Sequence, residues 1–164
     1  MKNVTMIAAV GKNLELGRNN DLIWRFKEDM KFFKEQTMGK PMVMGYNTFK
    51  SLPGVLPGRK HIVLCFEKVD LGSDVEVVTS MDELLEKIAE YPEVMIIGGA
   101  SIYKQMIDYS NKLILTEVDD EAKDADVYFP KFNKKEWSKK VLSEQVEDDI
   151  KYKHLVYTRK KTDK

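Results

Sequence analysis

Asp29 is the residue whose position most suggests chemistry, because a carboxylate there would share a helical face with apolar side chains. Within residues 19–37, NNDLIWRFKEDMKFFKEQT, the spacing of one helical face is followed by Phe26, Asp29, Met30 and Phe33. Apolar surroundings disfavour a charge unless a cationic or N–H-donating ligand stabilises it. Asp29 therefore suggests a site for a protonated heterocycle. Interaction with the positive end of its own helix is the alternative.

A pair of glycines marks a second candidate site. In VMIIGGASIYKQM an apolar strand runs into Gly98 and Gly99 and then into a helix opened by Ser101. Glycine lets the backbone approach a ligand closely, and the N–H groups at a helix N-terminus attract anions. A tight structural turn would explain the pair equally well, and the pattern is not the GxGxxG dinucleotide fingerprint.

The stretch VMGYNTFKSL repeats this strand-to-helix junction, with Gly45 followed by Asn47 and Thr48. Ligands of α/β sheets collect at the carboxyl ends of the strands, so two such junctions could hold the phosphates of a dinucleotide. Capping of the following helix by Asn47 or Thr48 is the alternative.

Two further segments carry weaker signals. Arg59 follows a Pro-Gly corner in PGVLPGRK, where a guanidinium could bind a carboxylate through two hydrogen bonds, although isolated surface arginines usually have no specific role. The stretch GRNNDLIW, residues 17–24, has the composition of a mobile loop. Trp24 at its end is either an anchor or a core residue.

Composition limits the class of protein. The chain has 164 residues with 43% hydrophobic content, and we expect one domain over 1–164 with a frayed basic tail at 159–164. Lys plus Arg equals Asp plus Glu at 27 each, so no global field favours nucleic acid or anionic lipid. The lone Cys65 and the lack of a long apolar run predict a reduced, cytoplasmic protein without a membrane span.

Apolar runs alternate with helical patterns, which predicts an α/β fold with a largely parallel sheet and helices on both faces. Strands are expected at 4–10, 41–45, 61–65, 75–78, 94–99 and 112–118. Helices are expected within 24–36, 47–52, 80–91 and 101–110. Ser80 and Glu83 form a capping box for the third helix. After Pro130 the segments EWSKKVLSEQVE and KYKHLVYTRK predict an antiparallel hairpin at the sheet edge.

With these pieces in this order, the chain resembles dihydrofolate reductase of the bacterial chromosomal type from residue 4 to about 159. The resemblance rests on MIAAV, NDLIWRFKEDMKFFKEQTMGKPMVMG, LPGRKHIVL, IIGGASIY, KLILTEV and ADVYFP. It implies a single-domain fold of about eight strands, with an antiparallel C-terminal strand and about four helices. It also implies reduction of 7,8-dihydrofolate to tetrahydrofolate with NADPH, binding of antifolates, a monomer and no metal.

The resemblance also assigns roles to residues. Asp29 matches the carboxylate that grips the pterin, Thr116 its hydrogen-bonded companion, and Leu22 and Trp24 the mouth of the pocket. Arg59 matches the arginine that pairs with the glutamate tail, and residues 11–26 match the loop that closes over the nicotinamide. The remaining substrate positions are Ile7, Ala8, Met30, Phe33, Leu52, Leu56 and Ile97.

The cofactor positions follow from the same resemblance, which implies a cis Gly98–Gly99 bond. They are Ala9, Leu16, Gly45, Tyr46, Asn47, Thr48, Leu64, Cys65, Gly98, Gly99, Ala100, Ser101, Ile102, Tyr103 and Gln105.

Several positions depart from the family pattern. Ile23 stands where proline usually precedes the tryptophan, which predicts a less rigid loop. Tyr46 and Ser101 stand where basic or polar residues often read the 2'-phosphate of NADPH, and Cys65 and Phe66 replace what is often a serine or arginine pair. Each lost charge-assisted contact costs about 1 to 3 kcal/mol, so NADH becomes a possible donor.

Two other functions are compatible with the sequence. A pyrimidine reductase of riboflavin synthesis shares the fold, although Asp29 and Arg59 in folate-specific places argue against it. A binding module for folate or a nucleotide that has lost turnover is the other, prompted by the altered 2'-phosphate positions.

Overall fold

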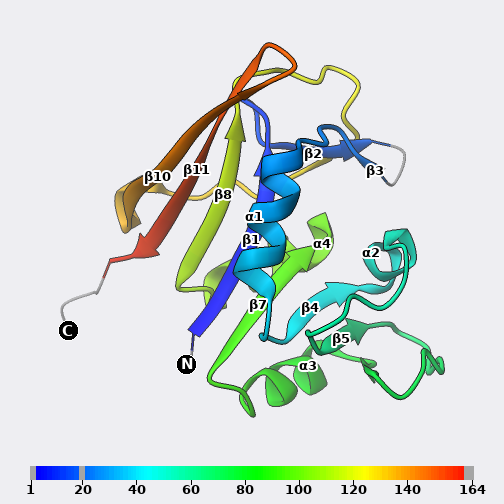
Figure 1. Cartoon of the computed structure of the whole chain (residues 1–164). Helices are drawn as coiled ribbons and strands as arrows, with labels where there is room; N and C mark the ends of the chain where they lie inside the picture. Colours follow the sequence, from blue (N-terminus) through cyan, green and yellow to red (C-terminus); the bar gives the residue numbers. More distant parts are fainter. Residues whose placement is uncertain (1–2, 19–20, 161–164) are drawn as a thin grey trace.

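The computed structural model describes residues 3–18 and 21–160, except the side chains of Asn3, Arg18, Asp21 and Leu22. Its central sheet contains β1 (Asn3–Val10), β4 (Met42–Gly45), β5 (His61–Leu64), β6 (Val75–Val78), β7 (Glu93–Gly98), β8 (Lys112–Val118), β10 (Trp137–Glu147) and β11 (Ile150–Arg159). The eight strands follow the order β10-β11-β8-β1-β7-β4-β5-β6 (Figure 1). The six strands predicted from apolar runs and the C-terminal hairpin are confirmed.

Strand direction also follows the prediction. Strands β1, β4, β5, β6, β7 and β8 pair in parallel, whereas β11 runs antiparallel to both β8 and β10. The central strand β4 is buried at Met42, Val43 and Met44, as a strand covered on both faces requires. Edge strand β10 is exposed along most of its length, which matches its mixed polarity.

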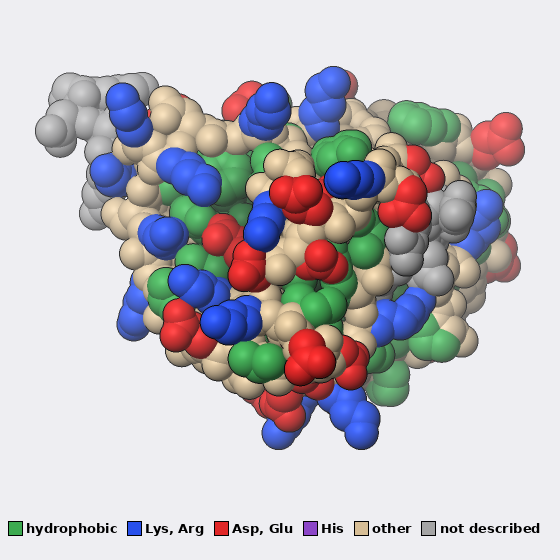
Figure 2. Space-filling view, turned by 90° about the horizontal axis from the view of Figure 1, so that it is seen from above, with side chains coloured by type: hydrophobic (Ala, Val, Ile, Leu, Met, Phe, Trp, Pro, Cys, Tyr) green, Lys and Arg blue, Asp and Glu red, His purple; other side chains and the backbone are tan. Residues whose placement is uncertain are grey.

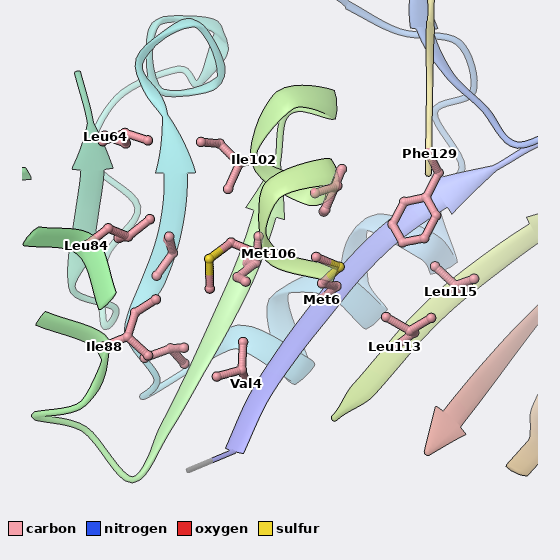
Figure 3. Close-up of a cluster of buried hydrophobic side chains, with 14 of the residues drawn as sticks. Val4, Met6, Leu64, Leu84, Ile88, Ile102, Met106, Leu113, Leu115 and Phe129 are labelled. Carbon is pink, nitrogen blue, oxygen red and sulfur yellow. The ribbon is translucent and has the colours of Figure 1, made fainter. Parts of the chain in front are cut away.

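Helices cover both faces of this sheet, as expected. They are α1 (Lys27–Thr37), α2 (Tyr46–Ser51), α3 (Met81–Ile88) and α4 (Ala100–Met106), with short 3-10 turns η1 (Ile107–Tyr109) and η2 (Lys134–Glu136). Helix α1 packs its Phe33 against Ile7 and Met95 on one face. On the other face, Leu84 of α3 and Met106 of α4 belong to the main core (Figure 3). Each such side chain, once fully buried, contributes about 1.5 to 3 kcal/mol.

A second, smaller sheet corrects the prediction of a mobile loop at 17–24. Strand β2 (Glu15–Arg18) lies between β3 (Asp21–Leu22) and β9 (Val127–Tyr128). Strands of two to four residues are too short to show an alternating pattern, which is why the sequence reads as a loop. Residues 19–20 of the predicted loop lie outside the described residues.

The helix ends bear out one capping prediction. The Ser80 hydroxyl accepts a hydrogen bond from the Glu83 N–H at 3.1 Å. The Glu83 carboxylate in turn accepts from Thr79, through its N–H at 3.2 Å and its hydroxyl at 3.0 Å. The box is thus closed one residue earlier than the usual pattern.

The predicted basic tail at 159–164 begins too early, since Arg159 and Lys160 are both held by hydrogen bonds. Arg159 is the last residue of β11, and its guanidinium donates to the carbonyls of Ser110 at 3.0 Å and Ile107 at 2.9 Å. It also lies 4.2 Å from the Trp137 ring centroid. Residues 161–164 lie outside the described part. Among the described helices, none is long and apolar enough to cross a membrane.

Candidate active site

Asp29 lies in the first turn of α1 and is held by side chains from two strands. The Thr116 hydroxyl of β8 donates to its Oδ1 at 2.5 Å, and His154 Nε2 of β11 lies 3.0 Å from the same atom. Thr116 and His154 are direct partners across β8 and β11, so the register of the two strands brings both to one carboxylate. The Asp29 side chain is only 18% exposed. The predicted pairing of Asp29 with Thr116 is present.

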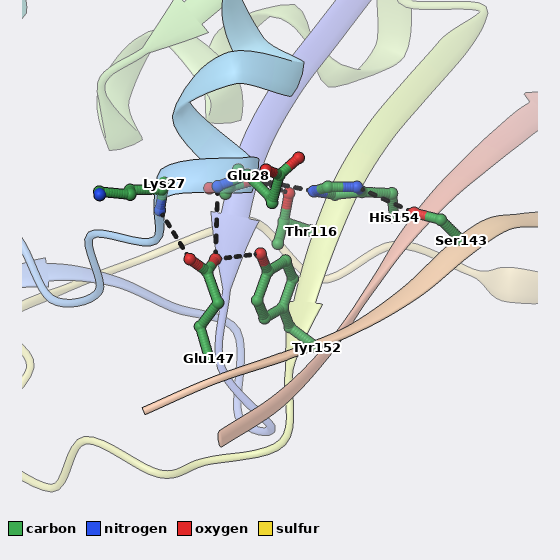
Figure 4. Close-up of polar contacts among 8 residues, drawn as sticks. Lys27, Glu28, Thr116, Ser143, Glu147, Tyr152 and His154 are labelled. Carbon is green, nitrogen blue, oxygen red and sulfur yellow. Dashed lines mark hydrogen bonds and ion pairs between the residues drawn. The ribbon is translucent and has the colours of Figure 1, made fainter. Parts of the chain in front are cut away.

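The start of α1 is fixed by a residue from the distant hairpin. Phe26 is the N-cap and offers no side-chain hydrogen bond, so the first N–H groups need another acceptor. The Glu147 carboxylate of β10 accepts from the Lys27 N–H at 3.1 Å and the Glu28 N–H at 3.4 Å (Figure 4). The Tyr152 hydroxyl donates to Glu147. The pKa of Tyr152 is raised mainly by burial and secondly by this hydrogen bond.

The apolar face predicted for α1 is only partly correct. Phe26 is buried and stacks on Tyr152 with ring centroids 4.5 Å apart, and Phe33 packs into the core beside the sheet. Met30, however, is 54% exposed. A residue following Asp29 by one position is turned about 100° around the helix, and here that turn carries it to solvent. Asp29 also lies in the first turn of α1, where the helix dipole favours a carboxylate.

Apolar side chains form a wall on the same face of the sheet as α1. Phe33 packs against Ile7 of β1, and Leu52 and Leu56 join it through the cluster that contains Met42 and Met44. Ile97 of β7 contacts both groups. Ala8 is half-buried on β1. Most residues expected to line a pterin and aminobenzoyl site are therefore brought together, whereas Met30 is exposed and Ala8 packs against the main core on the other face of the sheet. The Leu22 side chain lies outside the described part.

Arg59 is held in place by two hydrogen bonds at the far end of α1. Its Nε donates to the Pro57 carbonyl at 3.1 Å, and one terminal nitrogen donates to the Thr37 hydroxyl at 3.2 Å. Partial burial lowers the pKa of the guanidinium from its usual value. Such a pre-oriented guanidinium is suited to a carboxylate ligand.

The two glycine junctions lie side by side, because β4 and β7 are neighbours. The Gly98–Gly99 peptide is cis, as the resemblance implies. A Cβ on Gly99 would lie 3.2 Å from the Thr48 hydroxyl, and Gly98 has a φ of +135° that side chains rarely adopt. A Cβ on Gly45 would lie 3.4 Å from Ile102 of the neighbouring helix. Glycine is favoured at position 98 by its φ and at position 99 by the close Thr48 hydroxyl, whereas a Cβ at position 45 would make an ordinary contact.

The alternative in which Asn47 or Thr48 caps the helix at its junction is wrong. Gly45 is the N-cap of α2 and Gly99 that of α4, and neither helix has a side-chain cap. Asn47 and Thr48 lie inside α2, and the Ser101 hydroxyl accepts instead from Gln105 at 3.0 Å. The N–H groups that open α2 and α4 therefore have no side-chain acceptor among the described residues, which leaves them available to a ligand.

The other expected cofactor positions fall into two groups. Buried side chains shape the turn from beneath: Ile102, Tyr103, Leu64 and Cys65. Tyr103, for example, donates its hydroxyl to the Ile7 carbonyl at 2.6 Å, and burial raises its pKa. Half-buried or exposed side chains can meet a ligand directly: Ala9, Leu16, Tyr46, Asn47, Thr48, Ala100, Ser101 and Gln105.

The loop over 11–26 is attached to the segment that follows β8. The Trp24 indole donates to Asp120 at 2.9 Å, and the ring packs with Val118 and Ala122. Trp24 is thus both an anchor and a core residue. The Glu15 carboxylate, 1% exposed, accepts from the Asn13 N–H at 2.6 Å and the Ala122 N–H at 2.7 Å.

Sequence reasoning missed three residues here: Glu15, Glu147 and His154. The signal available for His154 was a polar residue between Tyr152 and Val156, at the inward-facing spacing of a strand. Figure 2, which views the end where the parallel strands finish, shows acidic and basic side chains interspersed around apolar ones. No field of one sign dominates the face seen there.

Comparison with known proteins agrees with this geometry. The family model for dihydrofolate reductase matches residues 3–161. Dihydrofolate reductase of Neisseria gonorrhoeae is 36% identical over 96% of this chain and 96% of its own. That of Bacillus subtilis (strain 168) is 33% identical over 98% and 97%, and dihydrofolate reductase type 3 of Salmonella typhimurium is 34% identical over 89% and 90%. This chain is a member of the dihydrofolate reductase family.

Proposed function

We propose that this protein reduces 7,8-dihydrofolate to 5,6,7,8-tetrahydrofolate, supporting thymidylate, purine and one-carbon metabolism. The observation that carries the proposal is the Asp29 carboxylate, held by Thr116 at one end of α1, with an apolar wall beside the helix and Arg59 bonded to Thr37 at the other end. One carboxylate, one apolar wall and one guanidinium match the three chemical parts of a folate: the pterin, the aminobenzoyl ring and the glutamate tail.

The chain's own groups do the positioning. Asp29 binds the 2-amino group and N3 of the pterin, which polarises the ring and favours protonation at N5 through water. Phe33, Leu52 and Leu56 hold the aromatic rings and exclude water from them. Arg59 binds the tail carboxylate. These contacts fix the pterin in one orientation and lower the entropic part of the barrier.

The glycine junctions fit a nicotinamide dinucleotide. Gly98, Gly99 and Gly45 leave room that a Cβ would fill, and the helices after them start without side-chain caps. Backbone N–H groups of α2 and α4 would therefore hold the phosphates. When bound, the cofactor supplies a hydride from nicotinamide C4 to pterin C6. We infer NADPH as the usual hydride donor. We also infer NADH as a second donor, because Tyr46, Ser101 and Cys65 offer no cation to a 2'-phosphate.

We further propose that the chain forms one domain and acts as a monomer in the cytoplasm. The formal net charge of zero supports small molecules as partners, with neither nucleic acid nor membrane among them. The one buried thiol, Cys65, supports a reducing compartment.

The direct test follows absorbance at 340 nm with purified protein, dihydrofolate and a concentration series of NADPH. We expect dihydrofolate-dependent oxidation of the cofactor, inhibited by methotrexate. Binding of methotrexate without any oxidation of NADPH or NADH would instead support a module that has lost turnover.

A further inference from the structure

His154 makes contacts that a core residue would not need. It is one of two histidines in the chain and is 2% exposed. Its ring stacks on Phe32 of α1, with centroids 3.8 Å apart and planes 7° apart, and Tyr152 meets it edge-on at 5.5 Å. The two aromatic contacts fix the plane of the imidazole. One ring nitrogen faces α1 and the other faces β10 (Figure 4).

The two ring nitrogens have partners of different character. Nε2 lies 3.0 Å from Asp29 Oδ1, and Nδ1 lies 3.1 Å from the Ser143 hydroxyl. An ionised carboxylate only accepts, so Nε2 carries the proton of that hydrogen bond. The Ser143 hydroxyl can either donate to a bare Nδ1 or accept from a protonated one. The Nε2–H donor is therefore kept in both the neutral and the charged state of the ring.

We propose that His154 is a positioning residue for the reaction: it donates Nε2–H to Asp29 Oδ1 and holds the carboxylate in one orientation, which leaves Oδ2 to the pterin. This inference rests on the proposed function. Oδ1 already takes hydrogen bonds from Thr116 and His154. Two bonds are the normal capacity of one carboxylate oxygen, so the first donor from a ligand meets Oδ2.

Other titratable groups lie on the elements next to His154. Helix α1 contributes Lys27 and Glu28 beside Asp29, β10 contributes Glu147, and β11 contributes Tyr152 (Figure 4). Thr116 is the neutral partner from β8. Glu147 is occupied by the helix N-terminus and by Tyr152, which leaves Asp29 as the carboxylate bonded directly to the imidazole.

Two substitutions separate a donor role from mere packing. H154F keeps a planar ring on Phe32 but has no donor, whereas H154Q places an amide N–H near the position of Nε2 and does not titrate. We expect H154F to lower kcat/KM about tenfold at pH 7, since Asp29 loses a hydrogen-bond donor. H154Q should recover most of this loss. Equal effects of the two variants, or none, would overturn the donor role.

A measurement on the unaltered protein keeps the proposal testable if H154F fails to fold. The Leu56 N–H donates to His61 Nε2 at 3.0 Å, so His61 must carry its proton on Nδ1, the tautomer opposite to that expected for His154. Long-range 1H–15N correlation spectra should show one histidine of each kind, or His154 protonated on both nitrogens. A bare Nε2 on His154 would overturn the contact.

The outcomes for His154 and for the function are distinguishable. Absence of turnover in the unaltered protein would overturn the proposed function itself. Turnover with the same kcat/KM in the unaltered protein and in H154F would overturn only the role of His154.

Discussion

At the scale of single residues, Arg59 is the clearest test of substrate choice. Its guanidinium is oriented by Pro57 and Thr37, and a lysine could not reproduce both contacts and a bidentate grip on a carboxylate. We expect R59K to raise KM for dihydrofolate about tenfold, the cost of about one charge-assisted hydrogen bond. The matched control is dihydropteroate, which lacks the glutamate tail. An equal rise in KM for both substrates would show that Arg59 does not bind the tail.

Cofactor choice also belongs to the residue scale. Tyr46 opens α2 beside the glycine junctions, and its ring lies under the Lys50 ammonium, 4.8 Å from the centroid. A cation at position 46 would add one charge-assisted contact to a 2'-phosphate, so Y46R should raise the preference for NADPH over NADH roughly tenfold. Y46Q is the neutral control. The ratio of the two kcat/KM values is the readout. A preference of a thousandfold or more in the unaltered protein would mean that other residues bind the phosphate.

At the scale of elements, Glu15 joins the small sheet to the segment after β8. Its carboxylate satisfies the N–H of Ala122, which is itself buried, and that of the exposed Asn13. E15A would leave the Ala122 N–H without a partner, which costs about 1 to 3 kcal/mol, while water can serve Asn13. Urea denaturation should show this loss, and amide exchange at Ala122 should speed up. E121A, which removes an exposed carboxylate from the same segment, should do neither; equal effects of both variants would disprove the role.

The strands and helices also show which parts of the fold the sequence predicts. Strands such as β4 and β5 were predictable because two-sided burial requires an unbroken apolar run. Strands β2, β3 and β9 were not, because two to four residues carry no period. Capping by Asn47 or Thr48 stayed open as an alternative in the sequence, because a turn that leaves N–H groups free for a ligand looks, in sequence, like one that caps them.

The candidate site was predictable where local motifs exist and not where it depends on tertiary contacts. Asp29, Arg59 and the glycine pair stand in recognisable local sequences. His154 meets Asp29 across 125 residues, and Glu147 reaches the start of α1 across 120. No local pattern encodes such contacts, since the register of β11 on β8 and the hairpin turn together determine them.

At the scale of the whole molecule, His61 links stability to pH. It is fully buried, and desolvation lowers its pKa below the unperturbed value of 6.5. Between the folded pKa and 6.5 the unfolded chain binds a proton that the folded chain does not. The free energy of unfolding therefore falls as pH drops below 6.5 and is fully restored above it. Denaturation at a series of pH values should show that the free energy of unfolding changes less steeply with pH in H61Q than in the unaltered protein. Identical slopes would contradict this assignment.

At this scale, separate parts of the chain together hold one carboxylate, that of Asp29. Helix α1 is pinned by Glu147, and strands β8 and β11 present Thr116 and His154 to Asp29. Every proposed step on the substrate depends on that carboxylate being ionised and correctly held.

The most direct measurement is the rate of NADPH oxidation with dihydrofolate at 340 nm, compared between the unaltered protein and D29N. Asparagine keeps the shape and one acceptor oxygen but removes the charge. We predict that turnover at pH 7 falls about a hundredfold or more, the usual contribution of a group that assists proton transfer, while thermal unfolding confirms an intact fold. Full activity in D29N would contradict the account.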